Sequence, residues 1–169
     1  KNMYLYYDKV LKNDPNDSYV LNNYAYFLAV DGERLDEALK MSAMTIEEDP
    51  KNVTYIDTYA WVLYKLGRYK EAKKWMEKLF SYDKNPQGVN YEHYGDILYK
   101  LGDVNKAVQN WKKAKKLGDT SEFIDQKIKD EKIYEWHEDK NRMYYHNDTI
   151  SDEFLLFGEG SYEIESSHI

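Results

Sequence analysis

Apolar residues occur along the chain at helical spacing, in stripes that stop and restart at regular intervals. In one stretch, Tyr59, Ala60, Leu63 and Leu66 fall on one side of a helix. Gly67 follows at a position suited to a left-handed helix end. A second helix with its own apolar stripe then begins, and that stripe is Tyr69, Ala72, Trp75, Met76 and Leu79. The pattern predicts two antiparallel helices joined by a very short turn.

This two-helix unit recurs with a period of 34 or 35 residues. Small residues such as Ala60 and Ala72 fall where the two helices are expected to cross, because a large side chain there would push the helices apart. Five columns are filled in three successive copies: Tyr24, Tyr59 and Tyr94; Ala25, Ala60 and Gly95; Leu28, Leu63 and Leu98; Gly32, Gly67 and Gly102; Ala38, Ala72 and Ala107. Such a register indicates an internal repeat.

These columns resemble the tetratricopeptide repeat (TPR) family, whose pattern of about 34 residues combines large apolar, Tyr, Ala, aromatic and Pro positions. The third copy is the most similar, and it reads Tyr91, Tyr94, Gly95, Leu98, Ala107, Trp111 and Ala114. The resemblance implies an all-α fold, a right-handed α–α superhelix (a TPR-like solenoid). Residues 21–26 and 57–63 look similar to bacterial repeat arrays.

The repeat predicts how the chain is divided. We expect a TPR-like array over residues 1–136 and a non-repeat tail over residues 139–169. Within the array we expect a half-repeat at 1–16, repeats at about 18–52, 53–86 and 88–121, and a capping helix at 120–136. Arrays need such a closing helix to cover the last apolar face. Because the chain starts in mid-motif, we interpret it as the C-terminal portion of a longer array.

The tail at 139–169 is rich in aromatic and acidic residues. Burial of its aromatic side chains would offset the entropy lost on ordering, so we expect the tail to pack against a surface. Three alternative packing surfaces are considered for the tail: the end of the array, the array's own concave groove and a neighbouring molecule. Alternation around Tyr162, Ile164 and Ser166 is typical of a short strand.

Composition narrows the function classes. The net charge is −7, which argues against nucleic acid as the main partner, because phosphate binding needs a basic surface. The chain has no Cys, which excludes disulfides and Cys-based zinc sites. No apolar run approaches the roughly 20 residues of a membrane span.

Candidate binding residues follow from the resemblance. The first helices of stacked hairpins line the concave side, and partner peptides of TPR proteins usually lie there. The inward positions are predicted to be Asn22, Tyr26, Ala29 and Val30 in the first copy, Asp57, Trp61, Tyr64 and Lys65 in the second, and Glu92, Asp96, Tyr99 and Lys100 in the third. Packing of Trp61 and Tyr64 on neighbouring hairpins or on the tail is the alternative.

The sequence argues against a carboxylate clamp, an enzyme active site and a metal site. TPR co-chaperones grip a terminal carboxylate with Lys, Asn and Arg, whereas the matching positions here are Asn22, Tyr26, Thr58, Val89 and His93, which argues against such a clamp. Walker, Rossmann and Gly-x-Ser-x-Gly motifs are absent from the sequence. His137 and His146 lie near acidic residues without the spacing of a helical zinc site. We therefore expect no enzyme activity, no cofactor and no metal.

The favoured function is a non-catalytic scaffold that binds a peptide or protein segment on the concave face. The alternative is a structural module that forms homo-oligomers, with the tail docked on a neighbouring copy. The Lys112–Lys116 run lies near a predicted helix end, where cations suit the helix dipole.

Overall fold

The computed structural model describes residues 2–137, 142–145 and 154–157. The chain divides into two compact units, Lys1–Pro86 (unit 1) and Gln87–Ile169 (unit 2). Unit 1 contains α1 (Asn2–Asn13), α2 (Ser18–Asp31), α3 (Leu35–Glu48), α4 (Val53–Lys65) and α5 (Tyr69–Tyr82). Unit 2 contains α6 (Gly88–Lys100), α7 (Val104–Leu117), α8 (Ile124–Asp130), β1 (Tyr134–His137), β2 (Arg142–Tyr145) and β3 (Phe154–Phe157).

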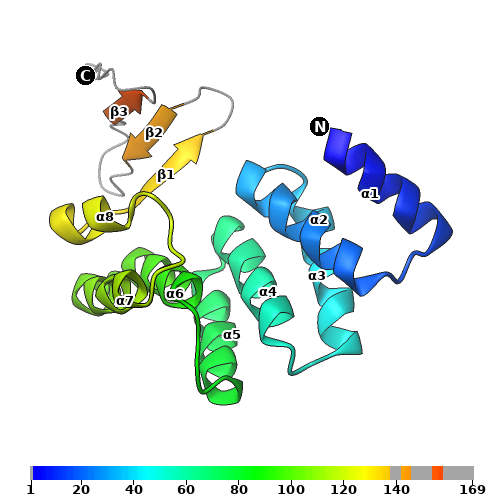
Figure 1. The fold of residues 1–169 in the computed structure, drawn as a ribbon, viewed down its shortest axis with the longest axis horizontal. Helices are drawn as coiled ribbons and strands as arrows, with labels where there is room; N and C mark the ends of the chain where they lie inside the picture. The colour runs from blue at the N-terminus through cyan, green and yellow to red at the C-terminus, as the bar shows by residue number, and fades with distance from the viewer. Residues whose placement is uncertain (1, 138–141, 146–153, 158–169) are drawn as a thin grey trace. The chain divides into compact units, whose positions relative to one another are not determined.

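The helices pair into hairpins: α2 with α3, α4 with α5, and α6 with α7 (Figure 1). Each pair lies inside one of the three predicted repeats. The prediction of an all-α, TPR-like fold is confirmed, and a small sheet follows the helices.

Side chains of the polar residues between the hairpins start two helices of unit 1. Asp17 accepts a hydrogen bond from the Val20 N–H at 3.0 Å, at the start of α2. The Asn52 side chain accepts from the Thr54 and Tyr55 N–H groups at 3.1 and 3.2 Å, at the start of α4. These N–H groups have no partner inside the helix, so the caps fix where α2 and α4 begin.

Tight turns then reverse the chain inside each hairpin. Gly32, Gly67 and Gly102 occupy equivalent turn positions and have φ angles of 69°, 78° and 88°. This left-handed conformation is strained for any residue with a Cβ atom. The glycine column of the repeat is therefore a backbone requirement, as the sequence predicts for Gly67.

Tyr24 joins three helices of unit 1. Its ring lies 5.4 Å from the Tyr4 ring and 5.3 Å from the Tyr7 ring, both on α1. The buried hydroxyl donates to Asp8 on α1 and accepts from Arg34 at the start of α3, each at 2.8 Å. The first copy of the Tyr column thus attaches α1 to the first hairpin.

In unit 2, α6 and α7 pack closely because a glycine faces a tryptophan. A Cβ atom on Gly95 would lie 2.5 Å from the Trp111 ring, which is fully buried. The second hairpin carries Ala60 and Met76 at the equivalent positions, and both are fully buried. Compared with the second hairpin, the third hairpin therefore has a smaller residue on its first helix and a larger side chain on its second helix.

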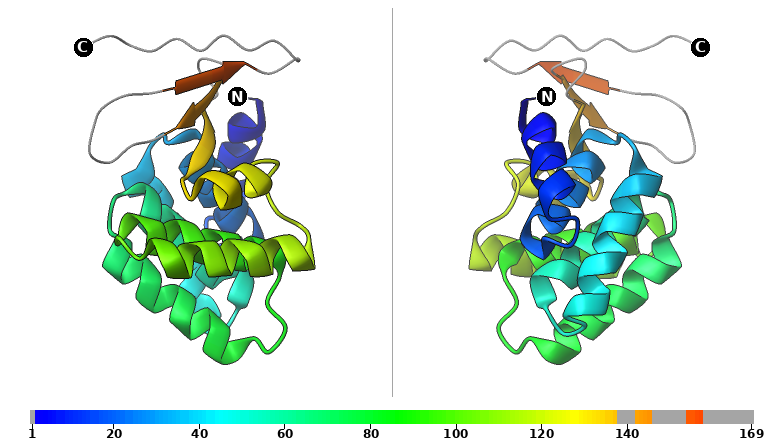
Figure 2. Two further views of the ribbon diagram at one scale, coloured as in Figure 1. Left: turned by 90° about the vertical axis from the view of Figure 1, so that its left-hand side faces the viewer. Right: turned by 90° about the vertical axis from the view of Figure 1, so that its right-hand side faces the viewer.

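The helix that follows the third hairpin is shorter than the predicted 120–136 segment. α8 ends where Glu131 adopts a left-handed conformation with φ of 55°, and the Glu131 N–H bonds to the Lys127 carbonyl. β1 begins at Tyr134, within the segment predicted to be helical. The left view of Figure 2, like Figure 1, shows α8 beside α7.

The three strands form one antiparallel sheet in the order β1–β2–β3. Tyr134 pairs with Tyr145 across β1 and β2, and Tyr145 pairs with Phe154 across β2 and β3. Two strands thus fall within the predicted tail. The strand expected around residues 162–166 lies outside the described residues, and docking of the tail stays a prediction.

Candidate functional site

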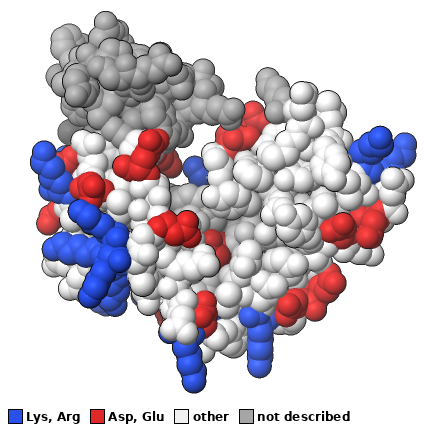
Figure 3. Space-filling model, in the orientation of Figure 1, with Lys and Arg blue, Asp and Glu red and all other residues white. Residues whose placement is uncertain are grey.

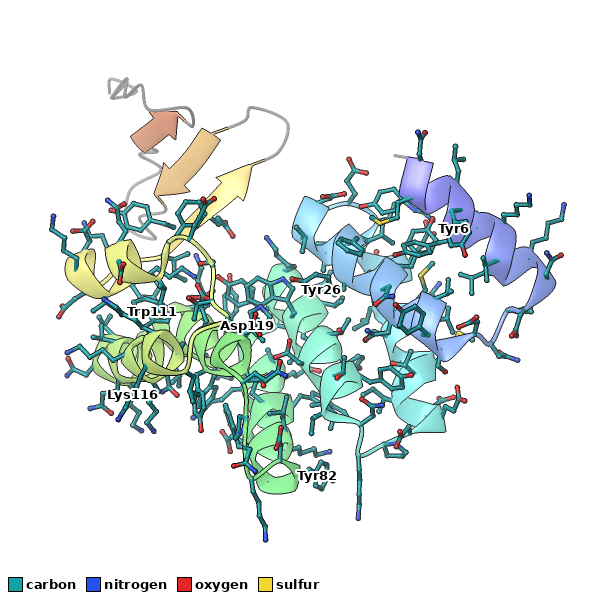
Figure 4. The ribbon with its side chains drawn as sticks, in the orientation of Figure 1. Tyr6, Tyr26, Tyr82, Trp111, Lys116 and Asp119 are labelled. Carbon is teal, nitrogen blue, oxygen red and sulfur yellow. The ribbon has the colours of Figure 1, made fainter. Side chains whose placement is uncertain are left out.

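Six of the predicted binding residues come from α2 and α4 of unit 1. We call this surface the α2–α4 face: Asn22, Tyr26, Asp57, Trp61, Tyr64 and Lys65. Asn22, Asp57 and Tyr64 are buried, whereas Tyr26, Trp61 and Lys65 are half-buried. Figure 4 labels Tyr26 on α2. Of the two flanking positions, Ala29 is buried and Val30 is exposed.

The α2–α4 face contains an aromatic stack on α4. The Trp61 and Tyr64 rings lie 4.5 Å apart, with only 12° between their planes. The Lys65 amine lies 5.8 Å from the centre of the Trp61 ring, within the range of a cation–π contact. Trp61 also packs against the hydrophobic core of unit 1. Core packing thus holds a flat aromatic surface with an adjacent positive charge.

Asn22 adds a polar group one helical turn before Tyr26. Its side chain is only 6% exposed, and its amide oxygen accepts no hydrogen bond from any described residue. A buried acceptor without a donor costs roughly 1–3 kcal/mol. The oxygen therefore has hydrogen-bonding capacity that the described residues leave unused.

The third hairpin differs from its predicted role. Glu92 and Asp96 were expected on an open concave surface, but each is only 3% exposed. The reason is α8, whose Lys127 inserts its amine between the two carboxylates. Tyr99 and Lys100, the other predicted positions on α6, are half-buried. In this structure Glu92 and Asp96 are therefore covered by the chain itself.

The Lys127 ammonium group sits in a buried ion cluster. Its Nζ atom lies 3.0 Å from Glu92 Oε1 and 3.0 Å from both oxygens of Asp96. The Trp111 indole N–H donates to Asp96 Oδ1 at 2.9 Å, and the Trp111 ring centre lies 6.0 Å from the amine. Figure 4 labels Trp111 in this region.

Glu92 has a second set of partners in the chain that leads to α8. The Ser121 N–H donates to Glu92 Oε2 at 2.7 Å, and the Ser121 hydroxyl bonds to Glu92 Oε1. Both carboxylates are thus hydrogen-bonded, which a buried charge requires.

Burial and charge act on these groups in opposite directions. Burial favours the neutral form of Glu92, but the Lys127 charge and the Ser121 bonds outweigh it and lower the Glu92 pKa. Burial dominates at Asp96 and raises its pKa, with Lys127 opposing and the Glu92 charge adding to the rise. Burial alone would lower the Lys127 pKa, yet the charges of Asp96 and Glu92 outweigh burial and raise it. Lys127 therefore remains an ammonium ion.

Lys127 was not identified from the sequence as a functional residue. Two signals point to it in retrospect. Glu92 and Asp96 are one turn apart on one face of α6, and Lys127 interrupts the apolar stripe of Ile124 and Ile128. A lysine inside an apolar stripe is a candidate partner for two carboxylates that share one helix face elsewhere in the chain, and together they would form a buried ion cluster.

Metal binding and membrane-spanning helices are assessed for the residues that the structure describes. Within that part of the chain, no group of three or more His, Asp or Glu residues could hold a metal ion. The His137 and His146 side chains lie outside the described ones. Likewise, no described helix is long and apolar enough to cross a membrane. Figure 3 shows Lys and Arg side chains gathered where α7 lies, and Lys112, Lys113, Lys115 and Lys116 are exposed there.

Repeated helical hairpins with small residues at the crossing place the chain among helical-repeat scaffolds. Residues 6–40 and residues 55–86 match two family models, each described as a tetratricopeptide repeat. These two segments of the chain are thus tetratricopeptide repeats. No curated protein sequence matches the chain.

Solved structures share the fold. A thermophilic TPR protein of Thermus thermophilus, TTC0263, has a TM-score of 0.61 at 10% identity, covering 74% of this chain and 69% of that one. The first TPR domain of human RPAP3 has a TM-score of 0.60 at 15% identity, covering 69% and 91%. YrrB, described as a TPR protein with an unusual peptide-binding site, has a TM-score of 0.55 at 24% identity, covering 67% and 57%.

Proposed function

We propose that this chain is a non-catalytic scaffold that binds a peptide or protein segment on the α2–α4 face. The two tetratricopeptide repeats at residues 6–40 and 55–86 support a protein–protein interaction scaffold. The observation that carries the finer proposal is the stack of Trp61 on Tyr64, with the Lys65 amine over the Trp61 ring. Trp and Tyr dominate binding energy at protein interfaces because they bury a large rigid area at small entropic cost.

The chemistry of this face suggests what it binds. A half-buried indole takes an apolar or aromatic side chain, and Lys65 favours a carboxylate beside it. The unused amide oxygen of Asn22 suits a backbone N–H of an extended segment, after a small movement of the Asn22 side chain. The expected ligand is therefore a peptide with an apolar anchor next to an acidic residue.

A library selection with a matched control tests the proposal. Peptides are selected from a random display library on the 169-residue chain, and their affinities for the variants are measured by calorimetry. We expect Trp61→Ala to weaken binding by about 10-fold or more, as truncation of an interface hot spot does. Trp75→Ala is the control, because Trp75 contacts Tyr59 and Lys78 rather than the α2–α4 face.

Circular dichroism of both variants checks that they remain helical. The proposal is wrong if selected peptides bind the Trp61→Ala and Trp75→Ala proteins equally well. It is also wrong if Lys65→Glu leaves the affinity for an acidic selected peptide unchanged. YrrB supports the proposal only as a related fold with a peptide-binding site of its own.

A further inference from the structure

The ion cluster of unit 2 has the geometry of a site that recognises a lysine side chain. Two carboxylates contact the ammonium group of Lys127, and the Trp111 ring lies beside it. The residues that form the site, Glu92 and Asp96 on α6 and Trp111 on α7, belong to one hairpin. The lysine comes from a separate element that follows the hairpin. The hairpin therefore acts as the receptor, and α8 is its occupant.

α8 is poorly suited to hold itself in place. It has only seven residues, and a helix of that length is not stable in water without tertiary contacts. Only Ile124 and Lys127 of α8 are buried. A further ion pair of α8 joins Asp125 to Lys115, and both side chains are largely exposed. The helix thus forms because it docks, and the buried contacts of α8 itself come from these two side chains.

The energetics of the cluster favour reversible docking. Burying the Lys127, Glu92 and Asp96 charges removes three ions from water, and this cost consumes much of the attraction between them. When α8 leaves, the Glu92 and Asp96 carboxylates regain water, so the open state carries no stranded charge. If the lysine alone is removed, two negative charges stay buried without a counter-ion while α8 is docked. The amine therefore determines which segment can occupy the site.

We propose that α8 is an internal ligand of the α6–α7 hairpin, and that a partner segment presenting a lysine next to apolar residues binds the same site when α8 undocks. The recognised chemistry is that of α8 itself, an apolar residue, a lysine three positions later and a second apolar residue, as in Ile124, Lys127 and Ile128. The site is distinct from the α2–α4 face, so the two proposals stand or fall separately.

A tethered segment and a free peptide compete for one site. The connection between α7 and α8 is short, and a short linker holds its segment at an effective concentration in the millimolar range. A free copy of the α8 segment therefore binds the wild-type chain poorly and binds well once the internal copy is weakened.

The test uses a fluorescent synthetic peptide of residues 121–133 and the full 169-residue chain. We expect Lys127→Met in the chain to bind this peptide at least roughly 10-fold more tightly than the wild-type chain, because the tethered competitor is lost. Amide exchange in α8 is expected to accelerate by roughly 100-fold, as after removal of one partner of a buried ion pair. Lys129→Met is the matched control: Lys129 is exposed on the same helix, and wild-type behaviour is expected.

Two neutral variants separate lysine recognition from apolar docking. A peptide carrying Lys127→Met is expected not to bind the Lys127→Met chain. A Lys127→Met chain that also carries Glu92→Gln and Asp96→Asn is expected not to bind the natural peptide. Ile124→Ala loosens α8 without leaving a charge unpaired. A chain carrying Ile124→Ala is therefore expected to bind the natural peptide, and this result still tests the proposal if the α6–α7 hairpin of the Lys127→Met chain unfolds.

The proposal is overturned if α8 in the Lys127→Met chain stays as protected as in the wild type. It is equally overturned if the natural peptide and its Lys127→Met form bind alike, or if neither the Lys127→Met nor the Ile124→Ala chain binds the natural peptide. Trp61→Ala is expected to leave binding of the 121–133 peptide unchanged. The peptide assay therefore tests the α6–α7 site independently of the proposal for the α2–α4 face.

Discussion

The contact between Gly95 and Trp111 leads to a prediction about Gly95→Ala. This substitution is expected to destabilise the wild-type chain but to stabilise a chain that carries Trp111→Met. In Gly95→Ala, the new Cβ atom would lie 2.5 Å from Cδ1 and Nε1 of Trp111 and 3.1 Å from the Ala107 carbonyl oxygen. Ordinary carbon contacts begin at about 3.5 Å, so the indole has to move by roughly 1 Å. The Trp111 ring is fully buried and bonded to Asp96, so this movement has little room.

The magnitude follows from three terms. Overpacking of a filled core costs about 1–3 kcal/mol. A strained hydrogen bond from Trp111 to the Asp96 carboxylate loses part of a further ~1.5–3 kcal/mol. Alanine gains about 1 kcal/mol over glycine inside a helix. We therefore expect Gly95→Ala to destabilise unit 2 by about 2 kcal/mol, although helix propensity alone predicts stabilisation.

The second hairpin supplies the compensating background. There Ala60 faces Met76 at the equivalent positions, and both residues are fully buried. Trp111→Met alone is expected to destabilise by roughly 2–4 kcal/mol, because it leaves a cavity. In that background, Gly95→Ala is expected to stabilise by up to about 1 kcal/mol, since the clash with the indole is gone and the propensity gain then outweighs the 3.1 Å contact with the Ala107 carbonyl oxygen.

Urea unfolding followed by circular dichroism measures the four corners of this double-mutant cycle. Amide exchange in α6 and α7 assigns the change to the third hairpin. The reasoning is refuted if Gly95→Ala stabilises the wild-type chain, or if its effect has the same sign and size in the Trp111→Met background.

Three shorter predictions concern other contacts. Asn52→Ala is expected to lower the free energy of unfolding of unit 1 by about 1 kcal/mol in urea titrations, whereas Asn52→Asp keeps the cap and is expected to stay near wild type; equal losses for both would contradict the capping role. Tyr24→Phe removes the hydroxyl that joins Asp8 to Arg34, and a loss of about 1–3 kcal/mol in the same assay is expected; a loss below the error of the measurement would show that these bonds are replaced by water. For Lys127 the folded pKa lies above its usual value of 10.5. While Glu92 and Asp96 are ionised, the ammonium form therefore stabilises docked α8 below pH 10.5, and this contribution is lost as the pH rises through the folded pKa. A ¹⁵N NMR titration of the Lys127 amine is expected to show a midpoint above 10.5, and a midpoint below that value would contradict the buried ion cluster.

The sequence was sufficient to predict features that depend on local spacing. The Tyr, Ala, Leu and Gly columns each reflect a requirement that repeats with the hairpin, such as the left-handed turn at Gly67. Periodicity therefore predicts the helical hairpins and the TPR-like fold, both of which the structure bears out.

Features that depend on pairing between distant positions could not be predicted in this way. Lys127 lies 31 residues from Asp96 along the chain, and nothing in the local spacing of either residue indicates that they meet. For the same reason Glu92 and Asp96 were assigned to an open face.

The end of α8 was missed for a different reason. The apolar spacing of Ile124, Ile128 and Ile133 continues past Asp130, but the chain leaves the helix at Glu131. The following Tyr134–His137 segment is rich in aromatic residues, which favour strands, and it pairs with β2. Strand pairing with β2, the next element along the chain, overrode the local helical pattern.

The buried carboxylates of α6 also constrain how the repeats of this chain can be rearranged. Glu92 and Asp96 need an ammonium group from whatever element packs on them, and in this chain that element is α8. A copy of the α4–α5 hairpin placed after α7 would have to offer a lysine at that position or strand two charges. Shuffling or duplicating hairpins is therefore not neutral for this protein: the third hairpin is suited to the last place in the series, and lengthening the series at that end requires a change at residues 92 and 96 first.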